Sequence, residues 1–590
     1  MKHYILFILL FFSALSYAQN DFYLAENYFR EGEYEKATQI YKKLFQKSKY
    51  NTVYLKRLLT CYQETEKFEV ADKLLRGALE KNPTLIYLNI EIGYNLERQQ
   101  KIEEAKSYYN LALIGIEKNP SLGSMSGRLF KQNNLLDFAI KAYRKTMEVN
   151  KNSNFDFQIA QIYGEKGDFE KMFSSYISLV DRNENYIGTV KRLVGRYISD
   201  DAYDKNNILF KRTLLKKSIS NPKNIWNELL SWLFTRQKEY QKALVQEKAL
   251  FKRDPSYLSN INTLGRTAFD NKDYKASKEC FTYVLSNTNF VEEKLFAHLY
   301  YLKSAVETED KNIEALFHKV LNSFGRTPFT LNIQIEYADY LTFKRSEPQR
   351  AKEVLEYALT LNSSKFEKAR IKLKLGDVLV FMGKYNKALI YFSQIQTQLK
   401  NHKLAQEARF KVAQTSYFKG DFKWAMAQLK VLKGSTTQLI ANDAVDLFLV
   451  ISDNQPQDSI PTGLKEFATA DLLAFQNKNT LATNLYSKII KKHKGQPIED
   501  EALFRQAAIF FKEKQFENAI TNYLAIINLD KEGILVDDAY YQLAEIYNFK
   551  INDPKKASEY YQKIIFDFGS SIYLVDARKK YRTLRGDTVN

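Results

Sequence analysis

Glycine and proline are scarce in this chain, which has 21 glycines and 10 prolines among 590 residues. Average usage of the two together is about 12%. An all-β protein of this length needs many tight turns built on these residues, so their scarcity excludes that class. It also excludes collagen-like and low-complexity chains. Disorder is excluded because 45% of the residues are hydrophobic and 14% are aromatic, enough to form a large core. We therefore expect a long, mostly helical, all-α protein.

Cysteine is almost absent, with only Cys61 and Cys280 in the sequence. Small exported domains that depend on disulfides carry more cysteines than this. The two residues fall on separate expected helices far apart in the sequence, whereas a disulfide requires Cα atoms within about 7 Å of each other. We expect both cysteines to be free and buried.

Motifs that carry chemistry are also missing. The sequence contains no GxxxxGK[ST], GxGxxG or GxSxG string of the kind that binds phosphate or positions a nucleophile. The five histidines show no zinc-site spacing with cysteines or carboxylates. We therefore expect no catalytic residues, no metal site and no cofactor, and we predict that the protein is not an enzyme.

Long apolar runs are confined to the N-terminus. Lys2 precedes the apolar run from Tyr4 to Phe12, and small residues stand at Ser16 and Ala18. This pattern is typical of a secretory signal peptide over residues 1–18, and the run is too short to span a bilayer. No cysteine follows the expected cleavage site, which argues against a lipid anchor. We predict an exported, soluble periplasmic protein that starts at Gln19; the alternative is an N-terminal core helix.

A repeat of about 34 residues runs through the chain. Ala37, Ala71, Ala105 and Ala139 are spaced by 34 residues each. Further units with the same pattern start at Ala160, Gly376, Ala413 and Ala507. In the first unit the pattern consists of a small residue, an aromatic, a glycine, an aromatic, an alanine, an aromatic and an aliphatic residue: Ala25, Tyr28, Gly32, Tyr34, Ala37, Tyr41 and Leu44.

This pattern predicts a helical hairpin. Apolar residues three and four apart form one stripe on each helix. The glycines at the turns, Gly32, Gly167, Gly383 and Gly420, can adopt the left-handed conformation that ends a helix. The Asp or Glu that follows most of them can cap the next helix. One hairpin cannot bury its stripe alone, so successive hairpins must stack.

With these residues in view, the chain resembles the tetratricopeptide repeat (TPR) family. The resemblance implies a right-handed superhelical solenoid of about fifteen hairpin units. It covers an N-terminal array over 19–360, degenerate at 186–222 and weak at 291–326. It continues over 366–452 and, after a polar linker at 453–463, over 464–590, where a capping helix closes the array.

The C-terminal part, roughly 366–582, has longer repeats, as shown by Ala482, Ala519 and Ala557, which are 37 and 38 residues apart. It is similar to bacterial periplasmic cell-division coordinators and outer-membrane assembly TPR lipoproteins. The anchoring cysteine of those lipoproteins is absent, so direct membrane tethering is not implied. Peripheral membrane association through a partner remains compatible with the sequence.

The TPR resemblance implies that the first helix of each hairpin lines a concave groove. Aromatic residues at groove positions can hold a peptide; alternatively, they only fill the family's own packing positions. The candidate partner-binding residues in the C-terminal part are Phe410, Tyr417, Phe418, Phe504, Phe511, Tyr541 and Phe549.

The chain has a formal net charge of +19, which favours anionic partners. Export makes nucleic acid an improbable partner. The basic residues of the degenerate unit form either an anionic contact patch or a solvated face; they are Lys191, Arg192, Arg196, Lys211, Arg212, Lys216 and Lys217.

From these features we predict a periplasmic scaffold or adaptor that binds envelope proteins during cell-envelope assembly, division or secretion. The alternative is a glycan- or peptidoglycan-associated binding protein that uses the same aromatic and basic groove residues.

Overall fold

The computed structural model describes residues 21–49, 51–434, 438–454 and 462–587. Within these ranges the regular structure is helical and no strand occurs, which confirms the all-α prediction. The predicted signal peptide over 1–18 lies outside the described residues, and so does most of the predicted linker at 453–463.

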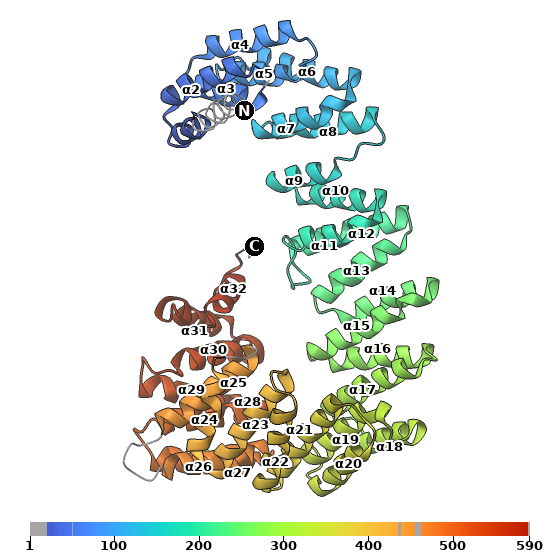
Figure 1. Cartoon of the computed structure of the whole chain (residues 1–590), viewed down its shortest axis with the longest axis vertical. Helices are drawn as coiled ribbons and strands as arrows, with labels where there is room; N and C mark the ends of the chain where they lie inside the picture. The colour runs from blue at the N-terminus through green and yellow to red at the C-terminus, as the bar shows by residue number, and fades with distance from the viewer. Residues whose placement is uncertain (1–20, 50, 435–437, 455–461, 588–590) are drawn as a thin grey trace, which may run out of the picture. The chain divides into compact units, whose positions relative to one another are not determined.

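The chain divides into two compact units, Met1–Gln237 and Lys238–Asn590. In both units, most helices that follow one another in the sequence pack as neighbours (Figure 1). The first unit contains a helix over 21–30, then α2 (Tyr34–Lys47), α3 (Thr52–Glu64), α4 (Phe68–Lys81), α5 (Leu88–Glu97), α6 (Ile102–Lys118), η1 (Pro120–Leu122), α7 (Gly123–Gln132), α8 (Leu136–Val149), α9 (Asp156–Glu165), α10 (Phe169–Arg182), η2 (Glu184–Tyr186), α11 (Ile187–Val194), α12 (Lys205–Ser220) and α13 (Asn224–Arg236).

The second unit contains α14 (Tyr240–Arg253), η3 (Pro255–Tyr257), α15 (Leu258–Asp270), α16 (Tyr274–Asn287), α17 (Val291–Glu307), α18 (Ile313–Phe324), η4 (Pro328–Thr330), α19 (Leu331–Phe343), α20 (Pro348–Thr360), α21 (Lys365–Phe381), α22 (Tyr385–Gln398), α23 (Lys403–Lys419), α24 (Phe422–Leu432), α25 (Gln438–Asp453), α26 (Thr462–Phe475), α27 (Asn479–Lys492), α28 (Ile498–Lys512), α29 (Phe516–Leu529), α30 (Val536–Ile546), the π-helical turn η5 (Tyr547–Ile551), α31 (Pro554–Asp567) and α32 (Leu574–Arg585). The boundary expected between 360 and 366 falls inside this unit, where α20 packs on α21.

The hairpin turns have the backbone conformation that the glycine pattern predicts. Gly32, Gly167, Gly383 and Gly420 all have positive φ, between 72° and 84°. Other hairpins place a side-chain-bearing residue there in the same conformation, such as Asn134 at φ 58°. The repeat therefore needs the left-handed turn but not the glycine itself, since the cost of a side chain there is modest and is met by packing elsewhere.

Capping of the second helix follows the prediction only where the residue is aspartate. The Asp168 carboxylate accepts a hydrogen bond from the Lys171 backbone N–H, and Asp421 accepts one from that of Trp424. Glu33, at the equivalent position before α2, makes no capping hydrogen bond. The prediction is wrong for this residue: Glu33 pairs with the Lys36 ammonium at 2.5 Å instead.

Close helix approach explains the small residue of each unit. Ala25 is fully buried, and Tyr41, sixteen positions later, is fully buried as well. In the unit that starts at Gly376, a Cβ added to this glycine would lie 2.3 Å from the ring of Phe392, again sixteen positions later. The small residue thus makes room for the aromatic ring of the partner helix, as the pattern predicts.

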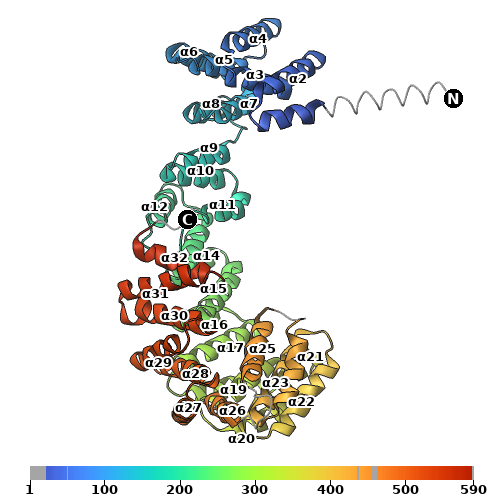
Figure 2. The same ribbon diagram turned by 90° about the vertical axis from the view of Figure 1, so that its left-hand side faces the viewer.

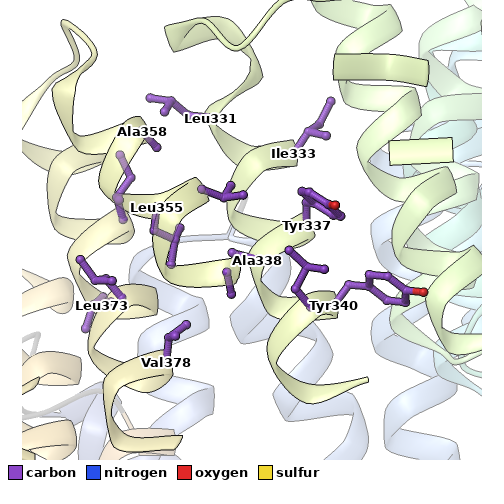
Figure 3. Packing of buried hydrophobic residues seen from close by; sticks show 14 of the residues in the cluster. Leu331, Ile333, Tyr337, Ala338, Tyr340, Leu355, Ala358, Leu373 and Val378 are labelled. Carbon is purple, nitrogen blue, oxygen red and sulfur yellow. The ribbon is translucent and has the colours of Figure 1, made fainter. Parts of the chain in front are cut away.

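The core of the second unit is built from these stripes. In Figure 3, side chains of α19 (Leu331, Ile333, Tyr337, Ala338, Tyr340), α20 (Leu355, Ala358) and α21 (Leu373, Val378) meet in one buried cluster. Further along the chain, buried residues of α23–α28 and of α28–α32 form the next two clusters. Figure 2 shows α28, α29, α30 and α31 lying in chain order.

Regular stacking is interrupted after α24. An additional helix, α25, stands in the sequence between the hairpin of α23 and α24 and the hairpin of α26 and α27. It packs on α23 and α24. The first helix of that later hairpin, α26, packs directly on α23. At its end, Gln476 donates a hydrogen bond to the Phe381 carbonyl and Asn477 donates one to the Phe343 carbonyl, both at 2.8 Å. These amides satisfy carbonyls that the ends of α21 and α19 leave open.

Both cysteines are free and buried, as predicted. Burial raises the pKa of Cys61 to about 11 and that of Cys280 to about 12. Since the thiolate is the reactive form, both thiols are unreactive near neutral pH. Among the described residues, no helix combines the length and hydrophobicity that a membrane crossing requires.

Candidate partner-binding surface in the C-terminal repeats

Three of the predicted groove residues, Phe511, Tyr541 and Phe549, lie on two neighbouring first helices of the C-terminal hairpins. Phe511 is at the end of α28, Tyr541 is in α30, and Phe549 is in the π-helical turn that extends α30. π-Helical turns occur often at functional sites. This turn lies within the 38-residue interval between Ala519 and Ala557. Part of the extra length of this repeat therefore forms the turn that carries Phe549.

Lys580 of α32 contacts two of these aromatics, Tyr541 and Phe549. Its ammonium lies 5.1 Å from the ring centre of Tyr541 and 5.5 Å from that of Phe549. It donates hydrogen bonds to the Tyr541 hydroxyl at 2.9 Å and to Glu545 at 2.7 Å, and it pairs with Asp576 at 2.7 Å. Cation–π contacts of this kind are favourable, and the carboxylates fix where the ammonium sits.

The electrostatics of this cluster keep its groups in one protonation state near neutral pH. Burial lowers the pKa of the Lys580 ammonium, but the hydrogen bonds to Asp576, Glu545 and Tyr541 outweigh it and hold the pKa above its usual value. Burial and the hydrogen bond that Tyr541 donates to Asp576 at 2.6 Å raise the pKa of Tyr541 to about 12. Lys580 therefore remains a cation and Tyr541 a neutral phenol over the physiological range.

Exposure singles out Phe549 on this surface. Its side chain is 59% exposed, whereas Phe511 and Tyr541 are half-buried. The Lys550 ammonium lies 5.9 Å from the Phe511 ring centre and adds a second cation. We call Phe511, Tyr541, Phe549, Lys550 and Lys580 the aromatic–lysine surface. It offers one exposed aromatic side chain beside two lysines, and aromatic side chains are enriched at protein interfaces.

Phe504, the fourth predicted residue in this region, belongs to the packing within the hairpin of α28 and α29. It is half-buried on α28, and its ring makes an edge contact with the buried Tyr523 at 5.8 Å.

Of the three predicted residues of α23, Tyr417 is covered by the chain itself and the other two are half-buried. Tyr417 is only 1% exposed, and its hydroxyl donates a hydrogen bond of 2.8 Å to Asp471 of α26. Tyr486 donates a second hydrogen bond to the same carboxylate. Phe418 is half-buried against Phe475 of α26. The prediction that Tyr417 contacts a partner is therefore wrong, because α26 occupies the face that this side chain points to.

Phe410, about two helical turns before Tyr417 on α23, is half-buried and packs against the cluster that includes α25. It lies on a different helix from the residues of the aromatic–lysine surface. Among the described residues, no observed contact links it to that surface.

The basic residues of the degenerate unit lie on α11, on the turn after it and on α12. Arg192, Arg196, Arg212 and Lys216 are exposed, and Lys191, Lys211 and Lys217 are half-buried. Lys217 pairs with Asp181 of α10 at 2.5 Å. Its charge is therefore paired within the first unit, while four of the other residues remain accessible to solvent.

Sequence reasoning missed the cations of the aromatic–lysine surface. Lys580 follows Asp576 by four positions, a spacing that places the two on one helix face. This spacing can be recognised in the sequence. The approach of α32 to α30 cannot, because that approach depends on the register of the last hairpin. Within the described ranges, no group of three or more His, Cys, Asp or Glu side chains forms a metal-binding arrangement.

Comparison with known proteins supports the tetratricopeptide type of repeat. Residues 537–565, covering α30 and most of α31, match the tetratricopeptide repeat family model. The fold is a TPR-type helical solenoid. A "TPR repeat-containing protein MJ1428" of Methanocaldococcus jannaschii is 27% identical over 164 residues, which is 28% of this chain and 29% of that protein. This chain thus aligns with less than a third of that relative's length.

Among solved structures, that of yeast Tom70 aligns over 92% of this chain and 99% of its own, with 15% identity and a TM-score of 0.28. The structure of Naa15/Naa10 bound to HypK-THB aligns over 91% and 94%, with 14% identity and a TM-score of 0.26. TM-scores of this size support no conclusion about this chain.

Proposed function

We propose that this protein is an exported, periplasmic TPR adaptor that binds protein partners in cell-envelope assembly, division or secretion. TPR-type hairpins support a role in protein–protein interaction rather than catalysis. The N-terminal sequence pattern of residues 1–18 supports export, and the absence of a cysteine after Ala18 supports a protein without a lipid anchor.

The observation that carries the binding assignment is the exposure of Phe549. The side chain projects from a π-helical turn, beside a lysine whose position three polar partners fix. Held this way, the surface loses little conformational freedom when a partner covers it, and preorganisation of that kind favours affinity. A partner with an apolar anchor for Phe549 and a carboxylate within reach of Lys550 would be complementary to it, because the Lys580 ammonium is already paired with Glu545 and Asp576.

The test is a crosslinked pull-down from envelope extract with the mature protein and two single variants, followed by mass spectrometry. Phe549→Ala should lose the recovered partner. Phe566→Ala removes a more exposed phenylalanine from α31, 74% exposed and outside the aromatic–lysine surface, and should recover the partner fully. Equal recovery of the partner by wild type and Phe549→Ala would refute the assignment of this surface as the binding site.

Retention of the pure protein by cell-wall sacculi, with no protein recovered stoichiometrically, would instead favour the glycan-binding alternative. Export is tested separately. N-terminal sequencing of protein from the periplasmic fraction should start at Gln19, and retention of Met1 would contradict the proposal.

A further inference from the structure

A pocket in the first unit is lined mainly by second helices of hairpins, α8 and α10, and closed by the intervening α9 (Figure 1). We call it the α8–α10 pocket. Its volume is about 230 Å³, less than a drug-sized ligand needs and enough for one small ring. The second helices α6 and α8 pack closely, and so do α10 and α12, whereas α8 and α10 do not. The wider spacing of α8 and α10 leaves room for the pocket.

A small acidic residue lines this pocket at a position that a large side chain can occupy. Four positions before the small residue of its unit, α30 has Tyr540, whose ring packs on Tyr560 and Phe568. At the same position α9 has Asp156, which is only 7% exposed. Arg182 pairs with its Oδ2 atom at 3.0 Å, but that oxygen accepts no hydrogen bond from the described residues. A buried oxygen without a hydrogen bond is uncommon and can accept one from a ligand.

The cations of the α8–α10 pocket call for one negative charge. Arg144 of α8 forms no ion pair with the described carboxylates, and its guanidinium donates one hydrogen bond, to the Tyr163 hydroxyl at 2.9 Å. That hydroxyl keeps its own proton for a ligand. Lys171 of α10 lies 5.5 Å from the Tyr163 ring centre and pairs with Asp168 at 2.6 Å. Because the buried carboxylate of α9 is paired as well, the guanidinium leaves one positive charge unbalanced.

Hydroxyl groups and two apolar side chains form the remaining walls. The hydroxyls of Ser174 and Ser178 on α10 have no hydrogen-bond partner within the described ranges. Ile159 and Met147 supply the apolar part of the lining. A complementary ligand therefore combines one carboxylate with several hydroxyls and a C–H face. Inorganic phosphate has no such face, and its dianion exceeds the single positive charge.

We propose that the α8–α10 pocket binds an acidic sugar unit. The sugar carboxylate accepts hydrogen bonds from Arg144 and from the Tyr163 hydroxyl, while a ring hydroxyl donates to Oδ2 of Asp156. Other ring hydroxyls exchange hydrogen bonds with Ser174 and Ser178. None of these residues belongs to the aromatic–lysine surface, so the site does not depend on the proposed adaptor function.

The test uses the full chain carrying methyl-labelled methionine and defined small molecules. The probes are methyl glucuronide, methyl glucoside, cyclohexanecarboxylate, inorganic phosphate and an acetylated, amidated Gly-Asp-Gly peptide. Methyl glucuronide should shift the NMR signal of Met147, which lines the pocket, and leave Met125 and Met426 unchanged. It should bind at least about tenfold more tightly than the other probes, because each of them lacks either the carboxylate or the ring hydroxyls. Equally tight binding of any of them would overturn the sugar assignment.

Two variants and a matched control locate the carboxylate. Arg144→Met keeps an unbranched side chain but removes its charge, and Tyr163→Phe removes only the hydroxyl. Arg144→Met should weaken methyl glucuronide binding at least about tenfold and Tyr163→Phe at least about threefold. Lys141→Met removes another exposed cation of α8 that does not line the pocket, and it should bind as wild type does. Equal losses in Arg144→Met and Lys141→Met would refute the pocket as the site.

Asp156→Asn tests the ring hydroxyl. It should weaken binding of methyl glucuronide but not of cyclohexanecarboxylate, which has no hydroxyl to donate and no longer meets a negative charge. An equal loss for both ligands would refute the hydrogen bond to Asp156. If Asp156→Asn does not fold, Arg144→Met and the comparison of the two ligands in wild type decide the question.

The source of the sugar is tested with an oligosaccharide that carries glucuronate inside its chain. Binding at least as tight as that of methyl glucuronide would identify a polymeric glycan as the ligand. Binding of methyl glucuronide alone would identify a free sugar acid. Binding of neither would overturn the proposal, and it would leave the result of the pull-down with Phe549→Ala unaffected.

Discussion

Replacing Glu501 with glutamine should make the second unit less sensitive to pH. Glu501 lies on α28 near Arg505, and burial raises the pKa of its carboxyl to about 8 against the opposing effect of that arginine. A carboxyl whose pKa is higher in the folded than in the unfolded state stabilises the fold below its ordinary pKa of 4.5. That contribution is lost as the pH rises from about 4.5 through about 8.

The magnitude follows from the size of the shift. One unit of pKa difference corresponds to about 1.4 kcal/mol, so complete ionisation of Glu501 removes up to about 5 kcal/mol of stability. Arg505 also pairs with Asp446 of α25 at 2.8 Å. Glutamine cannot ionise, so the variant should lack this loss between pH 5 and pH 9 while keeping the pair.

Because the chain has two units, a global unfolding signal would mix them. We would therefore equilibrate the protein in urea at several pH values and apply a hydrogen-exchange pulse at one common pH. Mass spectrometry of peptides from α28 then reports the local unfolding midpoint. The midpoint of wild type should fall from pH 5 to pH 9 by more than that of Glu501→Gln.

Glu517→Gln, at an exposed site on α29, is the matched control and should follow wild type. Parallel pH profiles for wild type and Glu501→Gln would refute the argument that Glu501 is buried as a neutral acid.

Three further predictions concern packing and the candidate surface. Gly376→Ala should destabilise the second unit by about 1–3 kcal/mol in urea unfolding, because the new Cβ would lie 2.3 Å from the Phe392 ring. Unchanged stability would show that the ring moves aside freely. Tyr417→Phe should destabilise the same unit by about 1.5–3 kcal/mol, since it removes a hydrogen bond to a buried carboxylate, and a neutral result would mean that this bond contributes nothing net. Phe549→Ala should change stability by no more than about 0.5 kcal/mol. It should weaken the binding of a purified partner by about 2 kcal/mol, as measured by calorimetry. A loss of stability as large as the loss of binding energy would identify Phe549 as a packing residue.

The local features of the fold were predictable because they depend on residues close together in the sequence. The turn conformation at Gly32 and the packing of an aromatic ring sixteen positions after the small residue both repeat from unit to unit. The left-handed turns at Asn134 and Lys514 were not predicted, because neither residue is a glycine and only the surrounding hairpin imposes the conformation.

The candidate site was predictable only in part, for a different reason. Tyr417 has the same sequence pattern as the exposed groove positions, but Asp471, 54 residues later, covers it. Phe549 was identified from its spacing, whereas its π-helical turn and the cation beside it depend on how α30 and α32 meet. Contacts between distant elements decide which pattern-matched aromatics reach the solvent, and one sequence does not specify them.

The hydrogen bond from Asn477 to the Phe343 carbonyl joins residues 134 positions apart. In an ideal repeat array each unit touches only its neighbours, so folding can begin anywhere and spread one hairpin at a time. Here a large loop must close before that bond can form, and such closure slows folding. Until the later hairpins arrive, the ends of α19 and α21 keep open carbonyls and Tyr417 lacks its acceptor. This stretch of the chain therefore reaches its native state as one cooperative block, and truncation after α24 would leave the preceding hairpins incompletely stabilised.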